Sequence, residues 1–278
     1  MLSSYNPALV ALSIAVATLA SFTALDLAGR ISLLAAARQR RLWLAGGAAA
    51  MGVGIWSMHF IGMLAFSLPI PLGYDLPITG ASLGIAIVVS YFALAVVTQR
   101  TLTPRRLVIG GILMGFGIAG MHYSGMAAMR MTPAIHYRAG LFAASLAIAI
   151  GASLAALWIA HTLRDSKQRR ILAKRIGAAA VMGLAITGMH YTAMAAADFP
   201  ADAICGALSG ADPSVASSAN TQWLATTVIL CTFGILLVTL ILSRLDARAT
   251  FLAGSVTTLN NQIVQLATFD TLTGLLNR

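Results

Sequence analysis

Three stretches of this sequence are nearly identical, and their repetition limits the fold more than any other feature. Each copy begins with Met-Gly, continues through Ile to a Met-His-aromatic triplet, and ends on a small residue and Met. The copies occupy residues 51–63, 114–126 and 182–194. A fixed period with this much identity is typical of an internal repeat, so we expect one structural unit to occur three times.

The spacing inside each copy has chemical content. On a helix, residues four apart lie about 40° apart around the axis and share one face. Each copy therefore presents an imidazole and a thioether along one stripe. Together these groups suit copper, and Cu(I) above all, better than zinc, magnesium or calcium. The candidate ligands are His59, His122, His190, Met63, Met126 and Met194.

The composition places the chain in a membrane. Of its 278 residues, 59% are hydrophobic and 9% are charged, with a mean hydropathy of +0.85, which excludes a soluble domain. The net charge of +10 is concentrated in loops, and it indicates membrane topology rather than a nucleic-acid partner. The two cysteines, Cys205 and Cys231, form no disulfide framework and no metal motif.

Seven apolar segments have the length of a membrane span, which predicts an all-α integral membrane protein. Arg and Lys gather in the first, third and fifth loops and after the last segment, whereas Asp198, Asp202 and Asp212 lie in the sixth loop. The positive-inside rule then places the N-terminus outside and the C-terminus in the cytoplasm. The predicted spans are 7–29, 42–67, 78–98, 107–130, 140–163, 173–197 and 222–243.

The three motifs fall in the second, fourth and sixth spans, which all run outward. Each histidine lies in the outer half of its span, so three parallel helix pairs are expected around a pseudo-threefold axis. The imidazoles would form one layer on this axis. The thioethers four residues later would form a second layer about 6 Å nearer the outside.

A heptad pattern follows the last span. Apolar residues alternate by four and three from Leu245 to Leu266, which predicts a cytoplasmic coiled-coil stalk that pairs two chains in parallel. The predicted domains are thus the seven-helix membrane domain at 1–243, the stalk at 244–266 and a last fragment at 267–278.

At this point the sequence resembles the MHYT family of bacterial membrane sensors, whose name the third copy spells as Met189-His190-Tyr191-Thr192. The resemblance covers roughly 7–243. It implies a location in the bacterial inner membrane, copper bound near the periplasmic side, and a diatomic gas (O2, CO or NO) or copper itself as the signal. The first copy departs from the pattern, because Phe60 stands where the others have Tyr123 and Tyr191.

The last residues, from Asp270 to Arg278, resemble the opening of a GGDEF domain, the catalytic unit of diguanylate cyclases. This resemblance implies a parent protein that makes or degrades cyclic di-GMP. The loop that gives the domain its name is not in the sequence, so the chain itself is not expected to be an enzyme.

Other interpretations remain open. The histidines could bond to hydroxyls of neighbouring helices (Ser57, Ser124, Thr187 or Thr192) while the methionines fill space. The function could then be the sensing of an apolar ligand, or alternatively copper handling and transfer. The methionines eight residues before each histidine (Met51, Met114 and Met182) favour packing over a second ligand layer. Residues expected beside the ligands are Met58, Met121, Met189, Tyr123 and Tyr191.

Overall fold

The computed structural model describes residues 3–32, 34, 36–99, 101–164, 171–200, 202–208 and 213–268. The chain forms two compact units, Met1–Ile235 and Leu236–Arg278. The segment that resembles the opening of a GGDEF domain lies outside the described residues from 269 onward.

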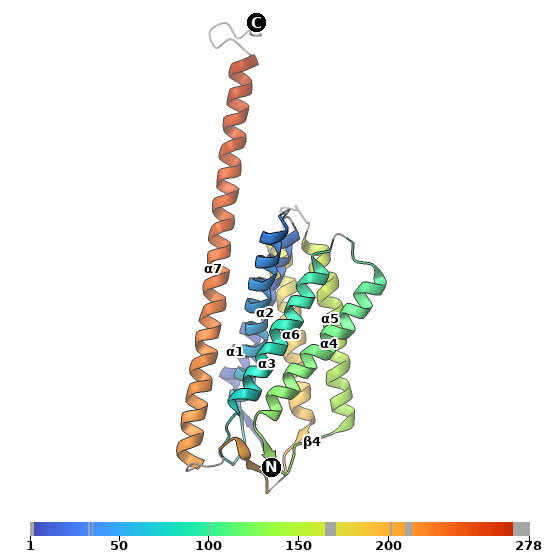
Figure 1. Ribbon diagram of the computed structural model, residues 1–278, viewed down its shortest axis with the longest axis vertical. Coiled ribbons are helices and arrows are strands. Elements are labelled where there is room, and N and C mark those ends of the chain that lie inside the picture. Colours follow the sequence, from blue (N-terminus) through green and yellow to red (C-terminus); the bar gives the residue numbers. More distant parts are fainter. Residues whose placement is uncertain are drawn as a thin grey trace. The chain divides into compact units, whose positions relative to one another are not determined.

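Six helices of the first unit are long and apolar enough to cross a membrane, by length and composition (Figure 1). Large apolar side chains such as Val88, Phe116 and Trp158 are exposed on them, as expected of surfaces that face lipid. The chain is therefore a multi-pass membrane protein. The helices are α1 (Pro7–Ser32), α2 (Ala37–Ala65), α3 (Leu76–Val97), α4 (Pro104–Ala127), α5 (Ala139–Arg164) and α6 (Ile171–Ala196).

The six helices form a closed ring in chain order, because each packs on the next and α6 packs back on α1. The motif helices α2, α4 and α6 also meet one another across the axis, through the second half of each motif. At the opposite end, α1, α3 and α5 line the axis with buried residues such as Ala28, Leu94 and Leu157. The sequence thus builds three helix pairs, as the repeat predicted.

The glycine of each Met-Gly pair sets how closely the helices approach. A Cβ at Gly52 or at Gly115 would lie 2.7 Å from the Cα of Ile87 or Ile150, respectively. A Cβ at Gly183 would lie 2.8 Å from the Cα of Thr18. No side chain fits at such distances, so the backbones pack directly on one another, as is common between membrane helices.

Short strands close one end of the bundle, which we call the strand end. β1 (Ser4–Tyr5) pairs with β2 (Phe66–Ser67), and β4 (His136–Tyr137) pairs with β5 (Ala197–Asp198). A third pair joins β3 (Met131–Thr132) to β6 (Ile204–Cys205), which is followed by the 3-10 turn η1 (Gly206–Leu208).

One backbone hydrogen bond at the strand end recurs in all three repeats. Asn6 N–H donates to the carbonyl of Ala65 at 2.9 Å. Asp75 N–H and Arg138 N–H donate in the same way to Ala128 and Ala196, each at 2.8 Å. Each acceptor lies six residues after its motif histidine. These bonds tie the end of each motif helix to the start of the helix that precedes it in the chain, and they fix the position of the motif along the bundle axis.

The seventh helix runs through both the predicted seventh span and the predicted stalk. α7 is one uninterrupted helix, Pro213–Thr268, so the predicted border between span and stalk at 243 falls inside it. The six helices named above are the candidate spans among the residues described, so the seventh span stays a prediction. Within the first unit, Leu224, Val228 and Ile235 of α7 are buried, and Ile235 packs beside Gly54.

Candidate metal centre

The three motif histidines meet on the axis of the bundle. His59, His122 and His190 are at most 1% exposed. Their Nδ1 atoms form a nearly equilateral triangle with sides of 3.1, 3.1 and 3.2 Å. Each ring meets the other two edge to face, with centroids 4.8–5.1 Å apart. The fold thus brings together three side chains that are far apart in the sequence.

This triangle cannot satisfy itself by hydrogen bonds. A neutral imidazole carries one N–H, and a hydrogen bond needs a proton on one nitrogen and a lone pair on the other. Three nitrogens in mutual contact cannot meet that condition along all three sides, so at least one side opposes like groups. Unpaired polar atoms in a buried site are costly. A cation at the triangle would use the three lone pairs at once.

The far nitrogens of the rings are tightly enclosed. Nε2 of His59, His122 and His190 is buried without a hydrogen-bond partner. Nε2 of His190 lies 2.3 Å from where a Cβ on Gly62 would stand, and Nε2 of His59 lies 2.2 Å from the same point on Gly125. These two glycines therefore let the neighbouring imidazoles lie directly against the helix backbone. Metal-bound histidines usually donate from this nitrogen to an acceptor, and among the described residues no acceptor lies within hydrogen-bond distance of it.

The predicted thioether layer is buried with the histidines. Met63, Met126 and Met194 are at most 2% exposed and lie one helical turn nearer the strand end. Met58, Met121 and Met189, directly before each histidine, are 2% exposed. Both sets therefore lie in the dry interior of the bundle with the imidazoles.

The tyrosines bond to neighbouring helices. Tyr123 Oη lies 2.8 Å from Ser145 Oγ of α5, and Tyr191 Oη lies 2.9 Å from Ser13 Oγ of α1. Each phenol also packs edge-on against its preceding histidine, with centroids 5.0 and 4.8 Å apart. The tyrosines thus brace the imidazoles from the side and direct their hydroxyls away from them.

The first copy solves the same problem without a hydroxyl. Phe60 occupies the tyrosine position and packs on His59 at a centroid distance of 4.7 Å. The serine of α3 that corresponds to Ser13 and Ser145 is Ser82, and it accepts from Trp56 Nε1 at 3.1 Å. Trp56 Nε1 therefore bonds to the serine position that the tyrosine hydroxyl contacts in the other two copies.

A sequence signal for these serines exists but lies outside the motifs. Each of α1, α3 and α5 carries two serines eight residues apart at matching positions, all of them buried. An alignment of these helices with one another would have found them. The pairs are Ser13 and Ser21, Ser82 and Ser90, and Ser145 and Ser153.

The interpretation that hydroxyls of neighbouring helices hold the histidines is wrong for three of the four proposed partners. Ser124 donates to Met121 and Thr187 to Gly183, both within their own helices. The Ser57 hydroxyl is buried without a partner. The histidines contact one another instead.

The two other histidines are separate from the triad. His136 lies in β4, opposite Asp198. Nδ1 of His161, near the end of α5, lies 3.4 Å from the carbonyl of Val97. Neither joins the cluster, as the sequence had predicted.

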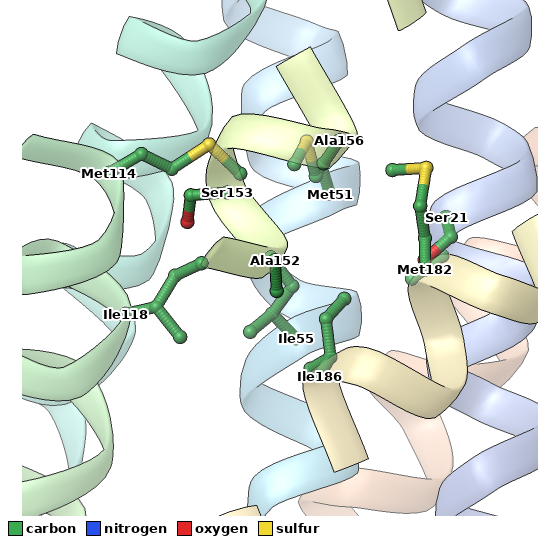
Figure 2. Close-up of a pocket in the computed structure, with 11 residues that line it drawn as sticks. Ser21, Met51, Ile55, Met114, Ile118, Ala152, Ser153, Ala156, Met182 and Ile186 are labelled. Carbon is green, nitrogen blue, oxygen red and sulfur yellow. The ribbon is translucent and has the colours of Figure 1, made fainter. Parts of the chain in front are cut away.

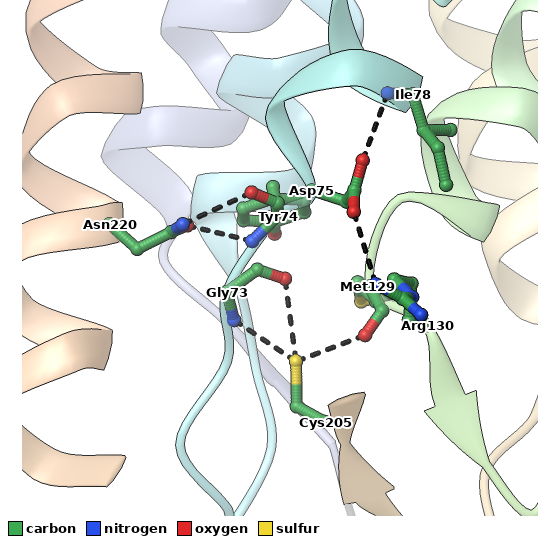
Figure 3. Close-up of polar contacts among 8 residues, drawn as sticks. All are labelled: Gly73, Tyr74, Asp75, Ile78, Met129, Arg130, Cys205 and Asn220. Atoms are coloured by element: carbon green, nitrogen blue, oxygen red, sulfur yellow. Dashed lines mark hydrogen bonds and ion pairs between the residues drawn. The ribbon is translucent and has the colours of Figure 1, made fainter. Parts of the chain in front are cut away.

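A contact that the sequence does not predict joins α7 to the bundle near the triad. Asn220 accepts from Tyr74 N–H at 2.7 Å and donates to the Tyr74 carbonyl at 3.0 Å (Figure 3). The buried Tyr74 ring packs on Phe60 at 5.7 Å, and Phe60 packs on His59. A continuous series of contacts therefore runs from the triad to α7.

The loop around Tyr74 is held from three sides. Cys205 Sγ lies 3.1 Å from the carbonyl of Met129 and 3.4 Å from that of Gly73 (Figure 3). Asp75 caps α3 by accepting from Ile78 N–H, and it pairs with Arg130 at 3.4 Å. This loop is thus a fixed platform for the α7 contact.

Comparison with known proteins identifies the repeat. The family model described as the bacterial signalling protein N-terminal repeat, MHYT, matches residues 52–110 and 115–173. No solved structure matches the chain.

The curated relatives are signalling proteins. The chain is 53% identical to the bifunctional diguanylate cyclase/cyclic di-GMP phosphodiesterase MucR of Pseudomonas aeruginosa, over 100% of the chain and 40% of the relative. It is 43% identical to the cyclic di-GMP phosphodiesterase NbdA of the same organism, over 69% of the chain and 24% of the relative. It is 39% identical to the signaling protein YkoW of Bacillus subtilis, over 72% of the chain and 25% of the relative. The chain thus spans less than half the length of these relatives, and it is an MHYT-repeat protein of the bacterial signalling type.

Proposed function

We propose that this chain is a membrane sensor that binds copper at the histidine triad and controls a cyclic di-GMP output. The convergence of three Nδ1 atoms in a buried site carries the proposal. Two of the relatives are cyclic di-GMP enzymes by name, and this supports a cyclic di-GMP output.

The triad fits a metal ion by its dimensions. Nitrogen ligands at 2.0–2.1 Å in a tetrahedral set lie about 3.3 Å apart. The observed separations of 3.1–3.2 Å come within a small adjustment of that value. His59, His122 and His190 would hold the ion, and the buried thioethers of Met63, Met126 and Met194 are candidates for further ligands.

The donor set favours copper, and Cu(I) in particular. Imidazole with thioether is a soft, neutral set, and the cluster contains no carboxylate. A monovalent ion also costs less to desolvate than a divalent ion in a site without a counter-charge. Bound Cu(I) would supply affinity for a diatomic gas, so we propose such a gas, or copper itself, as the signal.

The strand end would face the periplasm of the bacterial inner membrane. The loops at the other end carry the Arg and Lys clusters, as the positive-inside rule requires of cytoplasmic loops. The triad then lies on the side from which copper or a gas arrives.

The signal would leave the bundle through α7. A change at His59 reaches α7 through Phe60, Tyr74 and Asn220. Further along the helix, Leu252, Leu259 and Leu266 are 56–62% exposed, which leaves an apolar stripe open for a parallel homodimer through 245–266. Output domains attached after the stalk would then be paired by it.

The experiment compares copper-loaded with chelator-treated full-length protein in membranes and measures cyclic di-GMP turnover. We expect a copper-dependent change in wild type that disappears in His122→Ala. Turnover that ignores copper in both proteins would refute control by the metal. Copper-dependent transport into liposomes, with no effect on turnover, would instead support copper transfer, the alternative from the sequence.

A further inference from the structure

Three more soft donors surround the axis on the side of the triad away from the strand end. Met51, Met114 and Met182 lie eight residues before the motif histidines, about 12 Å away along the helices. They are 5–7% exposed. Figure 2 shows the three thioether side chains at one level, with Ile55, Ile118 and Ile186 at the next level.

These methionines border empty space on both sides. A cavity of about 30 Å³ separates them from the isoleucines, and a second of about 20 Å³ lies on the side of α1, α3 and α5. All three methionines line both cavities. Methionine is flexible and usually fills irregular gaps in a core. Three methionines that line the same two cavities and fill neither are not explained by packing alone.

A polar group reaches the same space. Ser153 lines the larger cavity and is 1% exposed, and its hydroxyl has no hydrogen-bond partner. Ser21, at the matching position of α1, also lines this cavity and donates to the carbonyl of Ala17. Most buried hydroxyls have a hydrogen-bond partner, so the Ser153 hydroxyl has unused capacity to contact a ligand in this cavity.

We propose that Met51, Met114 and Met182 form a second site on the axis, which binds one soft monovalent cation, Cu(I), through three thioethers. Thioethers select soft ions, and the aliphatic walls offer nothing to a hard divalent ion, which needs oxygen ligands. The Ser153 hydroxyl adds an oxygen dipole towards the charge. This site is independent of the histidine triad and could bind an ion without it.

The test uses Ag(I), which mimics Cu(I) without redox chemistry, and counts bound ions per chain by mass spectrometry. The main variant carries Met51→Leu, Met114→Leu and Met182→Leu. Leucine conserves the volume, so cores tolerate this exchange. The matched control carries Met129→Leu and Met131→Leu, which exchange two buried methionines outside the three motifs.

Wild type and the control are expected to bind one ion more than the main variant. An equal count in the main variant and wild type would overturn the thioether site, whatever the triad binds. If the triple variant does not fold, the single Met→Leu variants replace it, and each should weaken Ag(I) binding at this site at least tenfold. Unchanged affinity in all three would overturn the proposal equally.

The same count separates this site from the triad. His59→Ala should lose the triad ion and keep the thioether ion. Loss in the methionine variant with full retention in His59→Ala would support this inference while refuting the proposed copper sensor at the triad.

Discussion

The close contact between Gly125 and the His59 imidazole yields a sharp prediction. In Gly125→Ala, the new methyl group would stand 2.2 Å from His59 Nε2. Atoms that are not bonded need more than 3 Å, so the ring must move by at least about 0.8 Å. The methyl group is attached to the helix backbone and cannot turn away, whereas the imidazole can tilt. The His59 corner of the Nδ1 triangle is then displaced.

The size of that displacement sets the expected effect. Ligand constellations tolerate errors of about 0.5 Å, and changes beside metal ligands typically weaken metal affinity 10- to 100-fold. We therefore expect Gly125→Ala to bind Cu(I) roughly 10- to 100-fold more weakly than wild type. Competition against a chromogenic Cu(I) chelator measures this affinity in detergent.

Gly120→Ala is the matched control. It lies in the same helix, and a Cβ there meets nothing within 4 Å. It should leave the affinity unchanged and should not destabilise α4, because alanine has the higher helix propensity. Equal Cu(I) affinity in wild type and both variants would show that the contact between His59 and Gly125 does not position the imidazole, and the reasoning would fail.

Three further predictions concern the surroundings of the site. The hydroxyls of Tyr123 and Tyr191 bond to Ser145 and Ser13. Replacing either tyrosine by phenylalanine should therefore lower the free energy of unfolding by about 0.5–1.5 kcal/mol, measured by thermal unfolding, and leave the Cu(I) affinity unchanged. Loss of Cu(I) binding in either variant would show that the tyrosine is a metal ligand. Asn220→Ala leaves the Tyr74 N–H and carbonyl unpaired, and it should keep metal binding but reduce the copper response of cyclic di-GMP turnover; an intact response would rule out this route. Burial, and secondarily the nearby Tyr191 or Tyr123, raises the pKa of Tyr5 and Tyr137 to about 12. Because the unfolded phenols ionise near pH 10, stability should be full below pH 10 and should fall between pH 10 and 12, and Tyr137→Phe should flatten that fall in alkaline unfolding curves.

The sequence predicted the centre of this fold well, because the residue spacing within the motif determines which side chains share a helix face. A histidine and a methionine four residues apart must share a helix face, and three copies in alternate spans lead to one axis. The triad of His59, His122 and His190 follows from those two facts alone.

The contacts around the triad could not be predicted in the same way. Trp56 bonds to Ser82 in the copy whose Phe60 lacks a hydroxyl, and this bond depends on which serine of α3 faces α2. The hydrogen bonds between Asn220 and Tyr74 join a helix and a loop that are 146 residues apart in the sequence. No periodic pattern marks such a contact, because it depends on how the loops fold over the strand end.

The continuity of α7 has a physical reason. The change from apolar to charged residues near Arg244 marks the predicted border between span and stalk, but a change of composition does not interrupt a helix. The stretch carries no proline or closing glycine there, so the helix continues to Thr268.

The most direct measurement is the copper content of purified protein, determined by mass spectrometry after loading with Cu(I), for wild type and for His59→Ala, His122→Ala and His190→Ala. A shared axial site predicts that each single variant binds one copper ion fewer than wild type, since two imidazoles cannot replace three. If all three variants keep the wild-type content and differ only in thermal stability, the histidines form a structural core and the triad is not a copper site.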